Sequence, residues 1–208
     1  TNLPWVLDNI RKQGKGKTYD VLLGLSGGVE SSTCLHYLKE HDIRVLCWTM
    51  DNGYNDPKAD ENIMRLVEGM GVPLIRYVLD LDAFKELQAK FISSGTKNLE
   101  IPTDHVLLAA GYEMANRYGI KTIISGGNHA TEGIMPKSYG YDAKDLTFIK
   151  SVAGRIKNLP TISLFGYIVN RFVRGIKTVN LLDYYFYNRA ESVKLLEEKY
   201  GYKNYGEK

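Results

Sequence analysis

The feature that most constrains the fold is a regular alternation of short β-rich runs and longer helical runs over residues 19–127. The β-rich runs contain branched and aromatic residues, whereas the longer runs place apolar side chains at helical spacing. The predicted strands are residues 19–25, 44–50, 73–79 and 120–127, and the predicted helices are 29–41, 56–71, 80–95 and 102–119. This pattern is typical of βαβ units, so it predicts an α/β fold whose parallel sheet is covered on both faces.

Two of the predicted helices carry boundary signals. Pro57 fits the first turn of one helix, and Gly71 follows the end of the same helix. Thr103 or Asp104 can cap the start of another, because either side chain can accept from free backbone N–H groups.

Three of the predicted strands end in polar residues and glycine. They are followed by Ser26-Gly27-Gly28, by Asp51-Asn52-Gly53, and by Ser125-Gly126-Gly127-Asn128. In open parallel sheets, ligands bind at the carboxyl ends of the strands, near the point where the strand order reverses. The three strand ends therefore predict one shared cleft.

The remainder of the chain, residues 141–208, differs in character from the alternating part, residues 1–140. Residues 144–177 are basic and mostly helical in pattern, and residues 181–206 join a tyrosine-rich stretch to a final helix. No low-complexity linker or repeat separates the two parts. We expect a basic helical extension packed on the core, within a single structural domain.

Composition narrows the class of protein. The net charge of +3 is too small for a general nucleic-acid binder, and no apolar run reaches the roughly 18–20 residues of a membrane span. Cys34 and Cys47 lie in apolar surroundings without CxxC spacing, which favours buried free thiols over a disulfide. We therefore expect a cytoplasmic protein with no nucleic-acid partner and no membrane span.

The Ser-Gly-Gly break after the first strand has the chemistry of a phosphate cradle. Gly27 and Gly28 allow a tight turn and a close approach of a ligand to the backbone. The helix that follows presents unpaired N–H groups and the positive end of its dipole. Ser26, Ser31 and Ser32 add hydroxyl donors, so the stretch predicts a site for the phosphates of a nucleotide.

Other glycine motifs fit this stretch less well. The Walker pattern fails because no Lys-Ser or Lys-Thr follows the glycines, and the dinucleotide fingerprint lacks its third glycine. Residues 24–28 match the G-x-S-x-G elbow of hydrolases, with Ser26 as nucleophile and Asp104 and His129 as its partners. That alternative is disfavoured by the position on the first strand, by the acid four residues after the serine, and by the two other polar strand ends.

The string "SGGVESS" resembles the SGGxDS pyrophosphate loop of the PP-loop ATP pyrophosphatases, among them GMP, NAD and asparagine synthetases and tRNA thiolation enzymes. The resemblance implies a Rossmann-like, adenine nucleotide alpha hydrolase-like fold. It also implies ATP and Mg²⁺ as cofactors, and attack of a substrate oxygen on the α-phosphate. Glu30 stands where the superfamily usually has Asp, and it is the implied magnesium ligand. We expect Glu30→Asp to have equal or higher activity.

Further motifs resemble the N-acetyl sugar amidotransferases of bacterial surface-polysaccharide biosynthesis, of the lipopolysaccharide and pseudaminic-acid type. They are "MDNGYN", "EIPTDH", "ISGGNHATEGIMPKSYGY" and "RFVRGIK", and the resemblance runs from Trp5 to Gly206. It implies adenylation of the acetamido carbonyl of an N-acetylated nucleotide sugar, followed by displacement of AMP by ammonia to give an acetamidino sugar. It also implies a glutaminase partner, similar to the glutaminase and cyclase subunits of histidine biosynthesis, that supplies the ammonia.

The motifs assign candidate roles to the other residues. Asp51 and Gly53 border the adenosine or form a solvated turn, and Ser125 to Asn128 close over the phosphates or receive the sugar. The predicted catalytic residues are Asp104, Glu132 and Lys137, of which Glu132 binds magnesium or orients ammonia and Lys137 neutralises phosphate charge.

The predicted substrate contacts are Thr103, His105, Arg171 and Arg174. For Thr103 the alternative is helix capping, and for His105 it is simple packing. For the two arginines the alternatives are a solvated helix face and a docking surface for the ammonia-supplying partner.

Two other functions remain open. One is a PP-loop enzyme with another acceptor, of the NAD synthetase or tRNA-thiolation type, although thiolation is disfavoured by the absence of a CxxC pair. The other is a non-catalytic nucleotide-binding subunit, which the unusual Glu30 makes conceivable.

Overall fold

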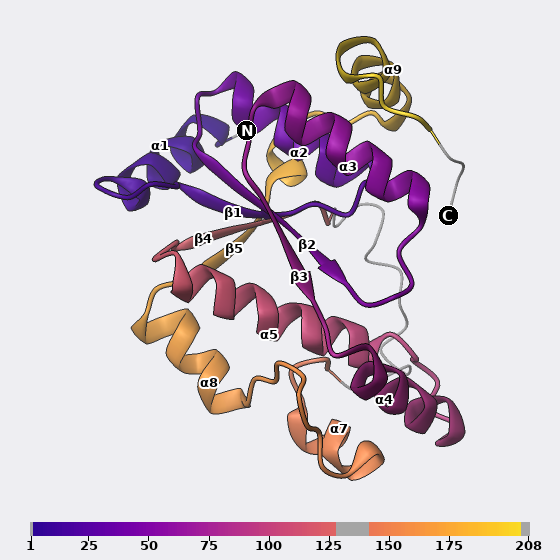
Figure 1. Cartoon of the computed structure of the whole chain (residues 1–208). Coiled ribbons are helices and arrows are strands. Elements are labelled where there is room, and N and C mark those ends of the chain that lie inside the picture. The colour runs from indigo at the N-terminus through magenta and orange to yellow at the C-terminus, as the bar shows by residue number, and fades with distance from the viewer. Residues whose placement is uncertain (1, 128–141, 205–208) are drawn as a thin grey trace.

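The computed structural model describes residues 2–127 and 142–204, and its centre is a five-stranded parallel sheet (Figure 1). The strands are β1 (Val21–Gly24), β2 (Val45–Asp51), β3 (Leu74–Val78), β4 (Thr122–Ser125) and β5 (Lys177–Asn180). Their order is β3-β2-β1-β4-β5, and every neighbouring pair is parallel. The predicted α/β fold with a parallel sheet is confirmed.

Helices cover both faces of the sheet (Figure 1). One layer holds α1 (Leu3–Gly14), α2 (Val29–Glu40), α3 (Pro57–Met70) and α9 (Arg189–Tyr200). The other holds α4 (Leu81–Ser93), α5 (Ile101–Arg117), α7 (Leu146–Ala153) and α8 (Leu164–Ile168), with a π-helical turn at Val169–Val173. A 3-10 turn at Leu181–Tyr184 leads towards α9. Alternate residues of β1 pack into the two layers: Leu23 joins the first, and Leu22 joins the second.

Local signals explain several helix boundaries. Asp56 accepts from the Lys58 N–H at 2.8 Å at the start of α3, and Gly71 ends that helix at φ +61. The start of α5 differs from expectation, because the helix begins at Ile101 and no side chain caps it. The predicted capping by Thr103 or Asp104 is wrong, since Pro102 allows the helix to begin earlier.

The segment after residue 141 contributes a strand to the sheet as well as helices. Lys177 ends the stretch expected to be helical, and no element is predicted for residues 178–180, yet residues 177–180 form β5 at the edge of the sheet beside β4. Val179 is the one apolar residue among the four, so no apolar run marks the strand, and it depends on pairing with β4. The final helix, α9, is present as predicted, and it packs against α2 through a hydrogen bond of 2.8 Å between His36 Nδ1 and Tyr200 Oη.

Two further expectations concern the core and the membrane. Cys34 and Cys47 are free and buried, as predicted, and burial raises the pKa of each thiol to about 12. Over residues 2–127 and 142–204, no helix is both long and apolar enough to cross a membrane.

Candidate active site

The glycine loop lies at the switch point of the sheet. The chain leaves β1 towards β2 on one side, while β4 pairs with β1 on the other. This is the place in an open α/β sheet where ligands usually bind. Gly126, after β4, packs against Ser31 near the glycine loop, whereas Gly53, after β2, packs against Leu81, and the predicted cleft shared by the three strand ends stays a prediction.

Serine hydroxyls hold the loop in shape. Ser32 is fully buried and donates to the Gly28 carbonyl at 2.6 Å, and Ser31 donates to the same carbonyl at 3.3 Å. Ser31 Oγ also lies 3.2 Å from Ser26 Oγ. Ser31 and Ser32 are thus engaged within the loop, whereas Ser26 is exposed at its tip.

Close contacts explain two of the glycines. Gly27 has a φ of +76, and a Cβ atom there would lie 2.4 Å from the Ala59 carbonyl oxygen in α3. At Gly126 a Cβ atom would lie 2.9 Å from the Ser31 backbone nitrogen, so only glycine lets the end of β4 approach α2 this closely. The loop is thereby packed between α3 and the end of β4.

The first turn of α2 follows directly on the glycine loop. Gly28 is the N-cap residue, and no side chain caps the helix. The backbone N–H groups of such a first turn need an acceptor, and the helix dipole favours a negatively charged one. This is the geometry that the phosphate-cradle prediction requires.

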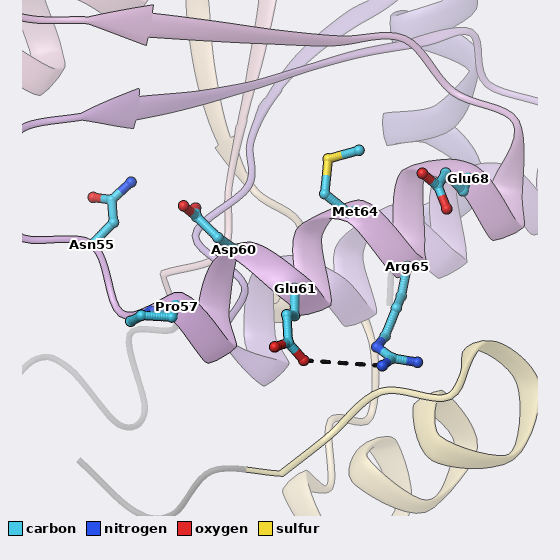
Figure 2. Close-up of a pocket in the computed structure, with 7 residues that line it drawn as sticks. All are labelled: Asn55, Pro57, Asp60, Glu61, Met64, Arg65 and Glu68. Carbon is cyan, nitrogen blue, oxygen red and sulfur yellow. Dashed lines mark ion pairs between the residues drawn. The ribbon is translucent and has the colours of Figure 1, made fainter.

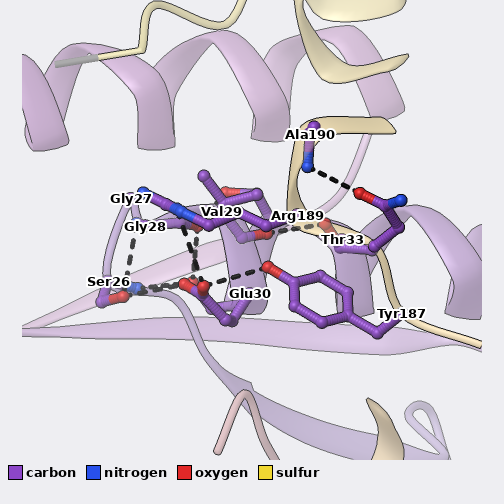
Figure 3. A network of polar contacts seen from close by, with 12 residues as sticks. Ser26, Gly27, Gly28, Val29, Glu30, Thr33, Tyr187, Arg189 and Ala190 are labelled. Atoms are coloured by element: carbon purple, nitrogen blue, oxygen red, sulfur yellow. Dashed lines mark hydrogen bonds and ion pairs between the residues drawn. The ribbon is translucent and has the colours of Figure 1, made fainter. Parts of the chain in front are cut away.

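The carboxylate of Glu30 is held by the C-terminal segment (Figure 3). Tyr187 Oη donates to Glu30 Oε1 at 3.0 Å, and Arg189 Nη1 lies 3.9 Å from the same oxygen. Burial and the neighbouring Glu30 carboxylate raise the pKa of Tyr187. Sequence reasoning missed both partners, because they are more than 150 residues away and carry no motif of their own.

The turn after β2 has the predicted place at the carboxyl edge of the sheet. Asp51 accepts from the Gly53 N–H at 3.0 Å and lies 3.8 Å from Arg76. Gly53 has a φ of +80, and a Cβ atom there would lie 3.2 Å from Leu81. These contacts shape the turn, and its role beside the adenosine stays a prediction.

The residues at the start of α5 divide into two kinds. His105 is buried; its Nδ1 lies 2.6 Å from the Ala143 carbonyl, and its Nε2 accepts from the Ile162 N–H at 3.3 Å. Both ring nitrogens are engaged by the protein, so the geometry favours packing over the predicted substrate contact. Thr103 Oγ1 accepts from Gln88 at 3.0 Å, and its predicted substrate contact stays a prediction.

Asp104 has a perturbed carboxyl group. Its side chain reaches solvent, yet desolvation by the surrounding protein, with a smaller contribution from Glu100, raises its pKa to about 6.

We expect a ¹³C NMR titration of the Asp104 carboxyl to show a midpoint of about 6, so that the group ionises only as the pH rises through that value. In Glu100→Gln the midpoint should fall, because a negative neighbour is lost. Glu113→Gln, at the other end of α5, should leave it unchanged; a midpoint at the ordinary value of about 4 in the unmodified protein would contradict this assignment.

Two predicted arginines, Arg171 and Arg174, lie away from the loop. Lys121 Nζ, just before β4, donates to the Arg174 carbonyl at 2.7 Å, which puts Arg174 and the neighbouring Arg171 near the amino edge of the sheet. Since the loop lies at the opposite edge, their predicted substrate contact in the shared cleft is not supported. Asn128, His129, Glu132 and Lys137 lie outside the described residues.

The hydrolase alternative makes Ser26 the nucleophile. Its hydroxyl lies 3.2 Å from Ser31 Oγ and accepts from the Gly28 N–H at 3.4 Å. His129, the base that this alternative names, lies outside the described residues.

Two surface depressions lie away from the loop. One, of about 680 Å³, runs along the exposed side of α3 (Figure 2). It is lined by Asn55, Pro57, Asp60, Glu61, Met64, Arg65 and Glu68. Three carboxylates against one guanidinium make it a poor site for a triphosphate. The predicted phosphate site is therefore argued from the backbone geometry of the loop.

Comparison with known proteins shows similarity at the level of fold. No protein-family model and no curated protein matches the chain. The NMN synthetase from Francisella tularensis aligns with 95% of this chain and 83% of its own, with a TM-score of 0.50 and 13% identity. The glutamine-dependent NAD⁺ synthetase from Acinetobacter baumannii, solved with ADP, aligns with 99% of this chain and 45% of its own, with a TM-score of 0.50 and 16% identity. This chain has the fold of these synthetases.

The likeness confirms the predicted fold class, a Rossmann-like, adenine nucleotide alpha hydrolase-like α/β fold. The NH3-dependent NAD synthetase from Campylobacter jejuni is also similar, over 62% of this chain, with a TM-score of 0.47 and 17% identity. The chain spans 56% of that protein and 45% of the Acinetobacter enzyme, or about half the length of each.

Proposed function

We propose that the protein is the ATP-dependent synthetase component of an amidotransferase that acts on an N-acetylated nucleotide sugar. The observation that carries the nucleotide part is the uncapped first turn of α2 beside the Ser26–Gly28 loop, at the switch point of the sheet. The motif resemblance to N-acetyl sugar amidotransferases supports the sugar.

The proposed reaction has two steps. The acetamido carbonyl oxygen attacks the α-phosphorus of ATP, and pyrophosphate leaves. Ammonia then adds to the carbon of the O-adenylyl imidate, and AMP leaves with the former carbonyl oxygen. The amide C=O thus becomes an amidine C=N, and the chain's own contribution is mainly to position the reactants and stabilise charge.

The loop supplies that stabilisation. Amides of the first turn of α2 would bind the β- and γ-phosphates, whose charge increases as pyrophosphate leaves. Hydrogen bonds from the Ser31 and Ser32 hydroxyls to the Gly28 carbonyl hold the loop in this conformation before ATP binds. A preformed donor set costs no reorganisation during the reaction.

Glu30 fits a magnesium ion. Mg²⁺ in nucleotide sites is usually bound by one or two carboxylates together with phosphate oxygens and water. The Oε1 atom of Glu30 is engaged by Tyr187, and Oε2 lies on the Gly28 side, 3.7 Å from where a Gly28 Cβ atom would be. Magnesium, when bound there, would neutralise charge on the phosphates.

A second candidate is favoured by the fold likeness to NMN and NAD⁺ synthetases. It is the same ATP chemistry with an acceptor of the NAD synthetase type. Asp104, near the start of α5 with its raised pKa, would serve either acceptor as a group that takes up a proton from ammonia. In both cases a glutaminase partner would supply the ammonia.

Pyrophosphate release separates the candidates. The protein is incubated with ATP, Mg²⁺ and ammonium, together with either UDP-N-acetyl sugars or deamido-NAD, and AMP and pyrophosphate are quantified. We expect release only with an N-acetylated sugar, with one AMP formed per amidine. Release only with deamido-NAD would favour the second candidate, and ATP binding without turnover on any acceptor, even with ammonium present, would favour a non-catalytic subunit.

A further inference from the structure

The phosphate loop lacks positive side chains. Residues 26–32 carry one ionisable side chain, Glu30, and it is negative. A triphosphate adds about three to four further negative charges, and backbone amides with a helix dipole of about half a charge do not balance them. Magnesium would balance part of this charge, and a cationic side chain from elsewhere in the chain would balance more of it.

The start of α9 brings an arginine to this place. Asn188 caps the helix by accepting from the Ala190 N–H at 3.0 Å, and Arg189 is the first helical residue. The Arg189 side chain is 40% exposed, and its Nη1 lies 3.9 Å from Glu30 Oε1. Figure 3 shows Tyr187, Arg189 and Glu30 gathered beside the glycine loop.

We propose that Arg189 binds the polyphosphate chain of ATP, and that Tyr187 is a positioning residue that orients Glu30 for the metal ion. This inference rests on the proposed function. A guanidinium group offers several N–H donors in a plane and matches phosphate oxygens well. Because Tyr187 and Arg189 both approach Oε1, they turn Oε2 towards Gly28 and the loop.

The helix that begins with Arg189 is attached to the loop region at both of its ends. Beyond its C-terminal end, Tyr202 is buried and donates to the Gly27 carbonyl at 3.0 Å. The buried Asn62 exchanges two hydrogen bonds with the backbone of Lys203, at 2.9 Å and 2.8 Å. At its N-terminal end, Tyr187 binds Glu30, so the helix lies beside the glycine loop and α3.

Calorimetric binding of three probes tests the role of Arg189. In Arg189→Met we expect affinity for inorganic pyrophosphate and for ATP to fall about tenfold or more, and affinity for AMP to stay unchanged, because AMP lacks the β- and γ-phosphates. Arg189→Lys should recover most of the loss. Lys194→Met, on the exposed side of the same helix, is the matched control and should bind all three probes like the unmodified protein.

A second measurement concerns Tyr187. In Tyr187→Phe we expect the Mg²⁺ concentration needed for half-maximal ATP binding to rise several-fold, with the affinity for metal-free pyrophosphate unchanged. A substitution that only destabilised the fold would lower the affinity for AMP and the affinity for pyrophosphate to a similar extent.

The outcomes separate this inference from the proposed function. Unchanged pyrophosphate affinity in Arg189→Met, or an equal loss for AMP, would overturn the inference while leaving the proposed function standing. If the unmodified protein binds neither ATP nor pyrophosphate, both fall. The salt dependence of pyrophosphate binding by the unmodified protein and by Arg189→Met gives a further check, since loss of one contacting cation should reduce its slope.

Discussion

Gly27→Ala is expected to abolish measurable ATP binding and to lower the free energy of unfolding by about 2–4 kcal/mol. The backbone at Gly27 has a φ of +76, which is costly for any residue with a Cβ atom. The added methyl group would also meet the Ala59 carbonyl, a backbone atom of α3 that cannot turn aside. The loop must therefore move, and the first turn of α2 would lose its preformed geometry. Urea unfolding and calorimetry with ATP measure the two effects.

Gly16→Ala is the matched control for this change. Gly16 also has a φ of +76, but a Cβ atom added there would meet nothing within 4 Å. Only the backbone strain should appear, at about 1–2 kcal/mol, with ATP binding unchanged. Equal losses of stability in the two variants, together with intact ATP binding in Gly27→Ala, would show that the contact with α3 does not shape the site.

Glu30→Gln is expected to lower the rate of pyrophosphate release about a hundredfold. The amide keeps the size of the side chain and can still accept from Tyr187, but it lacks the charge that would hold magnesium. Glu30→Asp keeps the charge, so its activity should equal or exceed that of the unmodified protein. Release of pyrophosphate at several Mg²⁺ concentrations measures both variants.

The control for Glu30 lies at the other end of the same helix. Glu40 is 48% exposed and pairs with His36 and Lys199, away from the loop. Glu40→Gln should leave the rate unchanged. If Glu30→Gln released pyrophosphate as fast as Glu40→Gln, the carboxylate would have no part in the chemistry.

Much of the fold could be predicted because its signals are local. The strands β1 to β4 and the helices between them follow from apolar periodicity, and the ends of α3 follow from Pro57 and Gly71. The start of α5 and the strand β5 could not be predicted in this way. The first is set by Pro102 rather than by a capping side chain, and the second is a short edge strand that exists through pairing with β4.

The same division holds for the candidate site. Residues 26–32 can be found from the sequence because their order along the chain is itself the signal, whereas the substrate contact predicted for His105 is disfavoured by its buried position. A histidine at a helix start has the same appearance in the sequence whether its ring faces a ligand or two backbone groups. Burial separates these cases, and burial is a property of the packed molecule.

By itself the sequence determined the alternating strands and helices and the glycine loop after the first strand, since each depends on residues close together in the chain. Only the tertiary structure decided that Tyr187 and Arg189 lie against Glu30, that Tyr202 reaches the Gly27 carbonyl, and that Arg174 lies at the opposite edge. The physical reason is that these contacts join residues far apart in the sequence. They depend on how α9 and β5 pack against the rest of the molecule, and no local pattern of residues predicts that packing.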